Sequence, residues 1–256
     1  MGKMGFFTDT TLCIGCKACE VACKQWNQLP ADGYKLTGNS YDNTTTLSAT
    51  TWRHVAFIEH KRPSEGTGKL VNWLMMSDVC KHCTNAGCLQ SCPTGALIRN
   101  EFGDVYLQPD ICNGCGYCVP SCPFGVIGRS ADTGIASKCT LCYDRQKDEI
   151  EPACAKACPT DSILFGDLDD LKVKARKRVD TLHERGEAAA HLYGVDEDTS
   201  VGDLNAFFLL MDRPSVYNLP EKPKLPQDNV LPGFVASLAA ATFLTLATAF
   251  SLWKRP

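Results

Sequence analysis

The longest apolar run of the chain lies near its C-terminal end. Residues 231–253 are mainly Leu, Ala, Phe, Val and Thr, and no residue from Asn229 to Trp253 is charged. Twenty-three residues of helix are enough to cross the hydrocarbon core of a bilayer with some tilt. Trp253 stands where an interfacial anchor is expected, with Lys254 and Arg255 just beyond it. The pattern favours a single transmembrane helix over the alternative, a buried helix of a soluble protein.

Two shorter patterns predict a hairpin. Residues 52–60 and 69–77 are rich in apolar, aromatic and β-branched side chains, and residues 63–68 between them contain proline, serine and glycine. This combination is typical of two antiparallel strands joined by a turn.

One amphipathic helix and one linker follow. Aliphatic residues recur at helical spacing, namely Leu168, Leu171, Ala175, Val179 and Leu182. Asp167 stands at the position of an N-cap, and Gly186 at the position of a C-terminal stop. Residues 214–230 are rich in proline, which predicts an extended linker before the apolar run.

Net charge and the N-terminal residues argue against two features, a strongly basic surface for nucleic acid and an N-terminal export signal. The 256 residues contain 26 Lys and Arg against 29 Asp and Glu, a net charge of -3. This balance excludes a nucleic-acid-binding protein that relies on overall positive charge. No apolar stretch of signal-peptide length precedes Thr8 and Asp9, so we expect no export signal at this end.

The sixteen cysteines form four groups of four, with none left over. The groups are Cys13, Cys16, Cys19, Cys23; Cys80, Cys83, Cys88, Cys92; Cys112, Cys115, Cys118, Cys122; and Cys139, Cys142, Cys154, Cys158. Their repeated two-residue gaps do not suit disulfides, because close neighbours on a tight loop cannot bridge without strain. The first and third groups match C-x2-C-x2-C-x3-C, the run that holds cubane iron-sulfur clusters in bacterial ferredoxins. The spacing therefore predicts [4Fe-4S] clusters, with zinc as the alternative, mainly for the last group.

The spacing also predicts how the groups share clusters. In two-cluster ferredoxins the fourth cysteine of each run ligates the other cluster. The second and third groups are offset by 30 to 32 residues, so we expect them to exchange their fourth cysteines, and the first and fourth groups to do the same. The predicted ligand sets, called quartets below, are quartet I (Cys13, Cys16, Cys19, Cys158), quartet II (Cys80, Cys83, Cys88, Cys122), quartet III (Cys112, Cys115, Cys118, Cys92) and quartet IV (Cys139, Cys142, Cys154, Cys23).

These patterns predict an α+β fold of two ferredoxin-like dicluster units, one inserted in the other, with a hairpin insertion and a C-terminal transmembrane helix. The expected divisions are residues 1–79 (first half of the outer unit with the hairpin), 80–130 (inner unit), 131–213 (second half of the outer unit with the amphipathic helix), 214–230 (linker) and 231–253 (anchor). Four clusters in one chain predict electron transfer.

A few further side chains are candidates. Lysines adjoin predicted ligands at Lys17, Lys24, Lys81 and Lys138, where they either raise a cluster's reduction potential or are plain surface residues. We expect core packing for Trp26, Trp52 and Trp73, and structural roles for His54, His60 and His82. No catalytic residue is expected on this chain.

The chain resembles the iron-sulfur (beta) subunit of membrane-bound respiratory formate dehydrogenase, within the four-cluster electron-transfer subunits of molybdopterin oxidoreductases. Beyond the cysteines, the resemblance rests on Gln25-Trp26-Asn27, Tyr41-Asp42-Asn43 with Leu47-Ser48-Ala49 and Trp52, Lys138-Cys139-Thr140-Leu141-Cys142 with Asp144-Arg145, Glu151-Pro152-Ala153-Cys154, and residues 214–220.

The resemblance implies two partners. One is a catalytic subunit with a molybdenum or tungsten pterin that oxidises formate, facing quartets I and IV; the other is a membrane cytochrome b that passes electrons to quinone, near quartets II and III. It also implies an inner-membrane protein whose cluster domain is exported with the catalytic subunit to the periplasm, leaving the C-terminus in the cytoplasm. There are two alternatives. The same four-cluster chain could transfer electrons for a nickel-iron hydrogenase or another molybdopterin oxidoreductase, or the chain could be a membrane-tethered zinc-binding scaffold.

Overall fold

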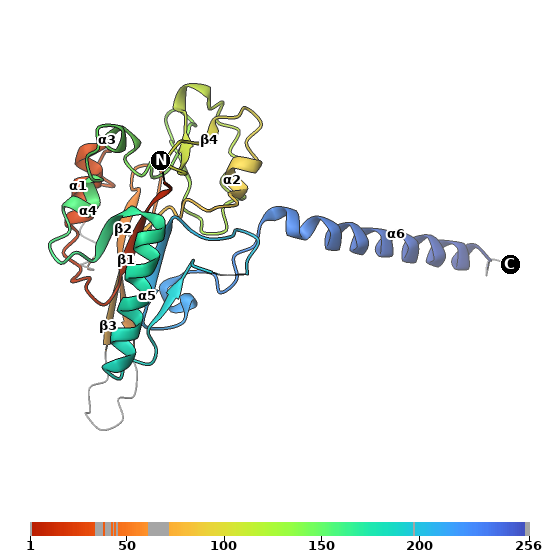
Figure 1. Ribbon diagram of the computed structural model, residues 1–256. Coiled ribbons are helices and arrows are strands. Elements are labelled where there is room, and N and C mark those ends of the chain that lie inside the picture. The colour runs from red at the N-terminus through yellow and green to blue at the C-terminus, as the bar shows by residue number, and fades with distance from the viewer. Residues whose placement is uncertain are drawn as a thin grey trace.

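The computed structural model describes residues 2–33, 38, 42, 44, 46–60, 72–196 and 198–253. Within these residues it contains a four-stranded sheet, three two-stranded hairpins and a projecting C-terminal helix (Figure 1). The strands are β1 (Met4–Asp9), β2 (Arg53–His60), β3 (Asn72–Val79), β4 (Leu97–Arg99), β5 (Val105–Leu107), β6 (Gly128–Arg129), β7 (Ala136–Ser137), β8 (Ile163–Asp167), β9 (His191–Tyr193) and β10 (Ala206–Leu210). The helices are α1 (Ala18–Trp26), α2 (Gly87–Gln90), α3 (Tyr143–Lys147), α4 (Ala153–Lys156), α5 (Leu168–Glu184) and α6 (Val230–Trp253), and the 3-10 turns are η1 (Pro109–Ile111), η2 (Pro214–Tyr217) and η3 (Pro226–Asn229). The predicted α+β class is confirmed.

The sheet joins segments that are far apart in the sequence. Its strand order is β8-β1-β10-β9, with β1 parallel to β10 and antiparallel to β8. Every residue of β10 is buried, as expected for a strand that is covered on both faces. The sheet therefore ties the N-terminal segment to residues 163–167 and 206–210.

Helix α5 packs against this sheet as its pattern predicted. The buried side chains include Leu171 and Ala175, which belong to the predicted apolar stripe. The carboxylate of Asp167 accepts hydrogen bonds from the backbone N–H groups of Asp169 and Asp170, at 3.0 and 3.4 Å. The predicted N-cap is therefore confirmed, and it satisfies two donors that the first turn leaves free.

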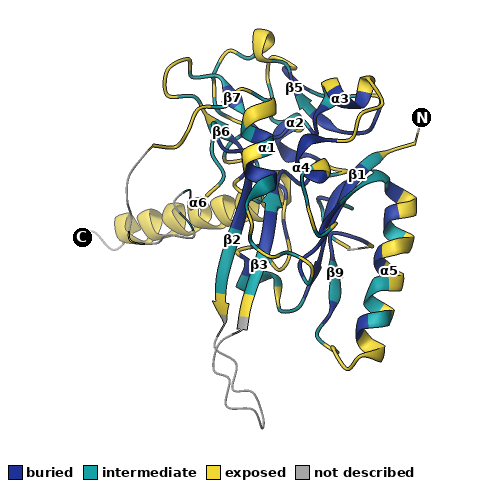
Figure 2. Ribbon diagram, turned by 90° about the vertical axis from the view of Figure 1, so that its left-hand side faces the viewer, coloured by how far each residue is buried: buried dark blue, intermediate teal, exposed yellow. Residues whose placement is uncertain are grey.

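The predicted hairpin is confirmed as β2 and β3, whose paired residues run from Arg53 opposite Val79 to His60 opposite Asn72. The predicted turn at residues 63–68 lies outside the described residues. Val55 and Met76 are buried on opposite faces of the hairpin, Val55 in the cluster that contains the cysteines and Met76 in the second cluster, so the hairpin lies between the two (Figure 2).

Two apolar cores stand side by side. The first consists largely of cysteines with small and aliphatic side chains from the short hairpins β4-β5 and β6-β7. The second lies between the sheet, α5 and the segment that leads to α6. Most of the larger aromatic side chains are in the second core, so the first depends more on what its cysteines hold.

The expected extended conformation of residues 214–230 is wrong. The segment forms the turns η2 and η3, and it buries Tyr217, Leu219 and Leu225 in the second core. Its prolines begin both turns, where the fixed φ of proline is compatible with helical geometry. The segment thus holds the base of α6 against the folded body.

Helix α6 leads away from the body and buries none of its residues (Figure 1). An 18-residue stretch within residues 226–253 has a mean hydropathy of 1.9, and within the described part of the chain this is the one helix long and apolar enough to cross a membrane. The alternative of a buried helix is wrong, because the helix is fully exposed. Lys254 and Arg255 lie outside the described residues.

We expect a chain that ends at Asn229 to move from the membrane fraction to the soluble fraction with its thermal unfolding midpoint unchanged. The reason is that α6 contributes an apolar surface and no core contacts. Fractionation and anaerobic thermal unfolding check this, and a midpoint lowered by several degrees would contradict it.

Candidate cluster-binding sites

The four C-x-x-C loops share one backbone feature. The residue just before the second cysteine has a positive φ in each loop: Gly15 at 68°, His82 at 46°, Gly114 at 73° and Leu141 at 55°. Glycine adopts this conformation freely, whereas histidine and leucine do so at a cost. Both side chains are fully buried, so the surrounding core holds them in this conformation. The same turn therefore recurs although only two loops carry glycine.

Quartet I lines one cavity, which contains all four of its cysteines and about 290 Å³ of atom-free space, including the part open to solvent. The cavity is bounded by Lys17, Ser77 and Ser162 as well. Burial raises the pKa of the Cys13 thiol, and the nearby thiolates of Cys158 and Cys16 raise it further. Cys158 thus lies beside a loop whose cysteines stand 139 or more positions earlier in the sequence.

Quartet II lines a second cavity of similar size, with about 320 Å³ of atom-free space. Burial raises the pKa of Cys83 well above its usual value, and the thiolates of Cys80, Cys122 and Cys88 add to this effect. His82 also lines the cavity, and its two ring nitrogens are buried without hydrogen-bond partners.

The remaining quartets are brought together too. Burial raises the pKa of Cys118, as do the thiolates of the other members of quartet III, Cys112, Cys115 and Cys92. In quartet IV, burial raises the pKa of Cys23 to about 12, with the thiolates of Cys154 and Cys142 among the further causes. Each predicted set thus collects its remote cysteine.

The spacing within each set does not suit one bare metal ion. Within the part of the chain that the structure describes, which includes all sixteen cysteines, no three His, Cys, Asp or Glu side chains are placed to hold a single metal ion. A tetrahedral zinc needs four thiolates at about 2.3 Å from one point. In a cubane each cysteine binds a different iron, so the thiolates stand farther apart. The donor sets therefore fit [4Fe-4S] clusters better than zinc.

The quartets form a row in the order I, IV, II, III. The thiolate of Cys154 is among the causes that raise the pKa of Cys19 after burial, which links quartet I to quartet IV. After burial, the thiolates of Cys23 and Cys80 raise the pKa of Cys139, which links quartet IV to quartet II. Quartets II and III adjoin in the same way, because Cys118 acts on Cys88.

The two exposed cysteines among the sixteen lie at the ends of this row. Cys16 of quartet I and Cys115 of quartet III are exposed, whereas the other cysteines are buried or half-buried. Exposed apolar side chains accompany both ends. They are Leu12, Ile14, Val21 and Trp26 in or near the first loop, and Ile111 and Tyr117 near the third. All four cysteines of quartet IV are buried, whereas Cys83 and Cys122 of quartet II are half-buried.

The lysines next to predicted ligands differ in their surroundings. Lys17 and Lys24 are partly exposed and pair with Asp42 and Asp32, at 3.2 and 3.0 Å. Lys81 and Lys138 are fully buried, so the surface alternative is wrong for these two. The charge of Lys138 faces thiolates of quartets II and IV as well as Asp104; burial lowers its pKa, but these anions raise it above its ordinary value.

The sequence did not single out Arg53 as a functional residue, and the predicted core packing is wrong for two tryptophans. Arg53 is almost completely buried between quartets I and IV, and only its place within the predicted strand 52–60 could have drawn attention to it. Trp26 and Trp73 are 43% and 45% exposed, so core packing is wrong for both, whereas Trp52 packs against the first core. The indole N–H of Trp26 donates to Asp144 at 2.7 Å.

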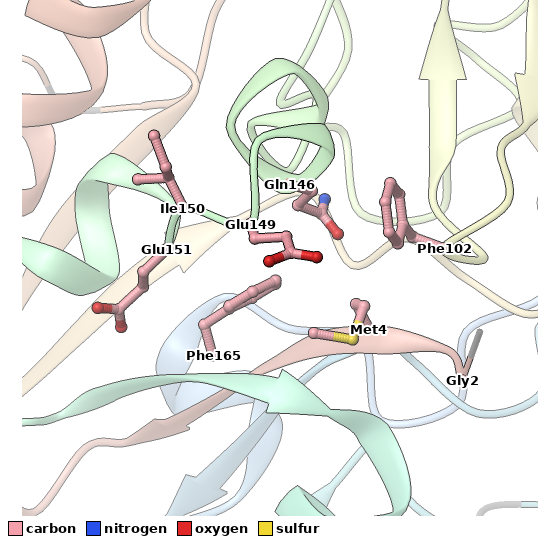
Figure 3. A pocket seen from close by; sticks show the side chains of 8 residues that line it. All are labelled: Gly2, Met4, Phe102, Gln146, Glu149, Ile150, Glu151 and Phe165. Atoms are coloured by element: carbon pink, nitrogen blue, oxygen red, sulfur yellow. The ribbon is translucent and has the colours of Figure 1, made fainter.

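A separate surface pocket contains none of the cysteines (Figure 3). Its lining consists of Gly2, Met4, Phe102, Gln146, Glu149, Ile150, Glu151 and Phe165. Phe102 and Phe165 face each other across it, with the carboxylate of Glu149 between them in the view. No group in it suits redox chemistry, so the pocket is not the predicted site.

Gly15→Ala should lower the unfolding free energy by roughly 2–4 kcal/mol and reduce the iron content. An added Cβ would meet Phe57 at 2.6 Å and Met75 at 2.7 Å, and the residue would keep its strained φ. Gly186→Ala is the matched control, because φ there is also positive but the Cβ enters open space. Iron analysis and thermal unfolding check this; equal effects of the two substitutions would contradict it.

Two segments match the 4Fe-4S dicluster domain family, residues 71–168 and residues 12–96. The formate dehydrogenase iron-sulfur subunit of Haemophilus influenzae is 39% identical over 221 residues, which cover 85% of this chain and 68% of the relative. The nitrate-inducible formate dehydrogenase iron-sulfur subunit of Escherichia coli is 39% identical over 241 residues, covering 92% and 79%. The thiosulfate reductase electron transfer subunit of Salmonella typhi is 35% identical over 189 residues, covering 72% and 88%.

Proposed function

We propose that this chain, which belongs to the family of formate dehydrogenase iron-sulfur subunits, carries electrons between a catalytic subunit that oxidises formate and a partner in the membrane. Its dicluster domains and sixteen cysteines fit four [4Fe-4S] clusters. When bound, each cluster supplies a site that accepts and releases an electron. We assign quartets I to IV as the four ligand sets, in two ferredoxin-like units of which one is inserted in the other.

The observation that carries the proposal is the continuous row of quartets with one exposed cysteine at each end. A structural role would need neither the row nor its exposed ends. The inner quartets lie within the apolar first core. This position limits the access of water and oxidants to their clusters.

The exposed apolar residues at the ends suit protein partners. Ile14 and Val21 are 59% and 67% exposed beside quartet I, where we place the catalytic subunit, which would carry molybdenum or tungsten pterin. Tyr117 is 62% exposed beside Cys115 of quartet III, where we place a cytochrome b that delivers electrons to quinone. Apolar and aromatic side chains are favoured at the centres of such interfaces.

The position of α6 supports a membrane partner beside quartet III. An added Cβ on Gly87, in the loop of quartet II, would lie 3.2 Å from Leu225 and 3.4 Å from Pro226, at the base of α6. Figure 1 likewise draws α2 close to the start of α6. An anchor at this end would bring quartets II and III to the membrane surface. We propose an inner-membrane location, with the cluster domain in the periplasm and the C-terminus in the cytoplasm.

Anaerobic purification tests the proposal directly. We expect about sixteen iron and about sixteen acid-labile sulfide per chain, because four cubanes hold four of each. Mass spectrometry should identify a copurifying pterin-containing large subunit with formate dehydrogenase activity. Zinc in place of iron would exclude the electron-transfer role, and a hydrogenase or a sulfur-compound reductase would change the partner but keep the role.

Cys92→Ser should impair the cluster of quartet III and leave that of quartet II, because Cys92 lies among the thiols of quartet III. Cys122→Ser is the matched variant and should do the reverse. Iron content and EPR spectra of the reduced proteins report the outcome. Damage by Cys92→Ser confined to the cluster on Cys80, Cys83 and Cys88 would refute the exchange of ligands.

A further inference from the structure

Arg53 is a buried cation that lacks a matching anion in the polypeptide. Its side chain on β2 is 1% exposed, and the guanidinium lies over the ring of Phe6, 4.8 Å from the centroid. Nη1 donates to the carbonyl oxygen and to Oγ of Ser77, at 3.3 and 3.0 Å. Nε and Nη2 are buried and have no hydrogen-bond partner, and no described carboxylate forms an ion pair with the group.

Such an arrangement is costly without a compensating charge. Removing a guanidinium from water costs several kcal/mol even after the protein relaxes, and each buried N–H without an acceptor adds to the cost. The chain retains the group nevertheless, so the compensating negative charge must lie close to it.

The cysteines of two quartets supply that charge when they are deprotonated as cluster ligands. Burial, the largest effect, lowers the pKa of Arg53, but Cys19 of quartet I and Cys154, Cys139 and Cys23 of quartet IV raise it above its ordinary value. Ser77 extends the contact, because its Oγ lies 3.0 Å from Nη1 of Arg53 and 3.2 Å from Sγ of Cys19. The guanidinium therefore stands at the boundary between the first two sites of the row.

The other buried cations are better satisfied by the polypeptide itself. Nζ of Lys138 donates to the carbonyl oxygens of Val105 and Cys139, and Nζ of Lys81 pairs with Asp78 and donates to the carbonyl oxygen of Val79. Arg53 differs because two of its three nitrogens have no acceptor in the chain.

We propose that Arg53 is a positioning residue shared by the clusters of quartets I and IV, and that its free N–H groups and fixed charge favour the reduced state of both. This inference rests on the ligand sets of the proposed function. Reduction adds negative charge to a site that already carries four thiolates. A fixed cation in a medium of low dielectric constant stabilises that added charge, and a single guanidinium close to both sites acts on both.

The test is an EPR-monitored redox titration of the anaerobically purified, cluster-loaded protein, in variants of Arg53. Arg53→Met removes the charge and keeps much of the volume, whereas Arg53→Lys keeps the charge but has no guanidinium fork. Lys177→Met removes one positive charge from the exposed face of α5 and is the control. Iron content is measured first in each protein. Variants of Cys16 and Cys142 assign the midpoints of quartets I and IV.

In Arg53→Met we expect the reduction equilibria of the clusters of quartets I and IV to shift at least tenfold toward the oxidised state. For a one-electron couple this is a fall of about 59 mV in each midpoint. Arg53→Lys should show a smaller shift in the same two midpoints, and Lys177→Met none. The midpoints of quartets II and III should stay at their wild-type values.

Unchanged midpoints in a fully loaded Arg53→Met protein would overturn the inference and leave the proposed function intact, as would equal shifts in all four clusters. If Arg53→Met does not retain its iron, the Arg53→Lys protein tests the inference in its place. Four wild-type midpoints in a cluster-loaded Arg53→Lys protein would also overturn it. A wild-type protein without iron would instead refute the proposed function.

Discussion

The rest of the structure depends on one electrostatic constraint, the collection of sixteen thiolate-forming side chains inside a single apolar body. Burial raises the pKa of interior thiols such as Cys23, Cys83 and Cys139, and neighbouring thiolates raise it further. In the free polypeptide these three thiols would therefore be neutral at pH 7. Iron reverses this preference, because a coordinated thiol loses its proton. Metal binding is for that reason expected to be coupled to the stability of the fold.

This constraint explains the division into two cores. The second core resembles that of an ordinary α+β domain, with Phe7 stacked on Phe207 at 5.3 Å and α5 covering the sheet. Apolar burial, together with the sheet hydrogen bonds, holds β1, β8 and β10 together in this core. The first core contains the quartets and few large side chains. The sheet of the second core therefore fixes segments of the chain next to the remote cysteines. One example is β8, which begins at Ile163, shortly after Cys158.

Two buried cations, Arg53 and Lys138, lie between neighbouring quartets. Arg53 and Lys138 are buried where quartet I meets quartet IV and where quartet IV meets quartet II. Between adjacent negatively charged sites, a cation lowers the repulsion that each site exerts on the next. The interior thus contains isolated cations that would be unfavourable in a purely apolar core, and their locations follow the row of cysteines rather than the secondary structure.

The sequence by itself determined the parts of this protein that depend on local spacing. Three thiols two residues apart favour an iron-sulfur cluster over zinc, the aliphatic spacing from Leu168 to Leu182 specifies a helix capped by Asp167, and an uncharged apolar run specifies the exposed helix α6. Composition and spacing could not place Arg53, because an arginine in a strand is usually at the surface, and its burial results from the fold around two quartets. The exposure of Trp26 and the folded state of residues 214–229 were also decided by tertiary packing, since local pattern does not specify which surface is covered. The order of the quartets was decided in the same way, because it depends on how the sheet and hairpins bring distant loops together.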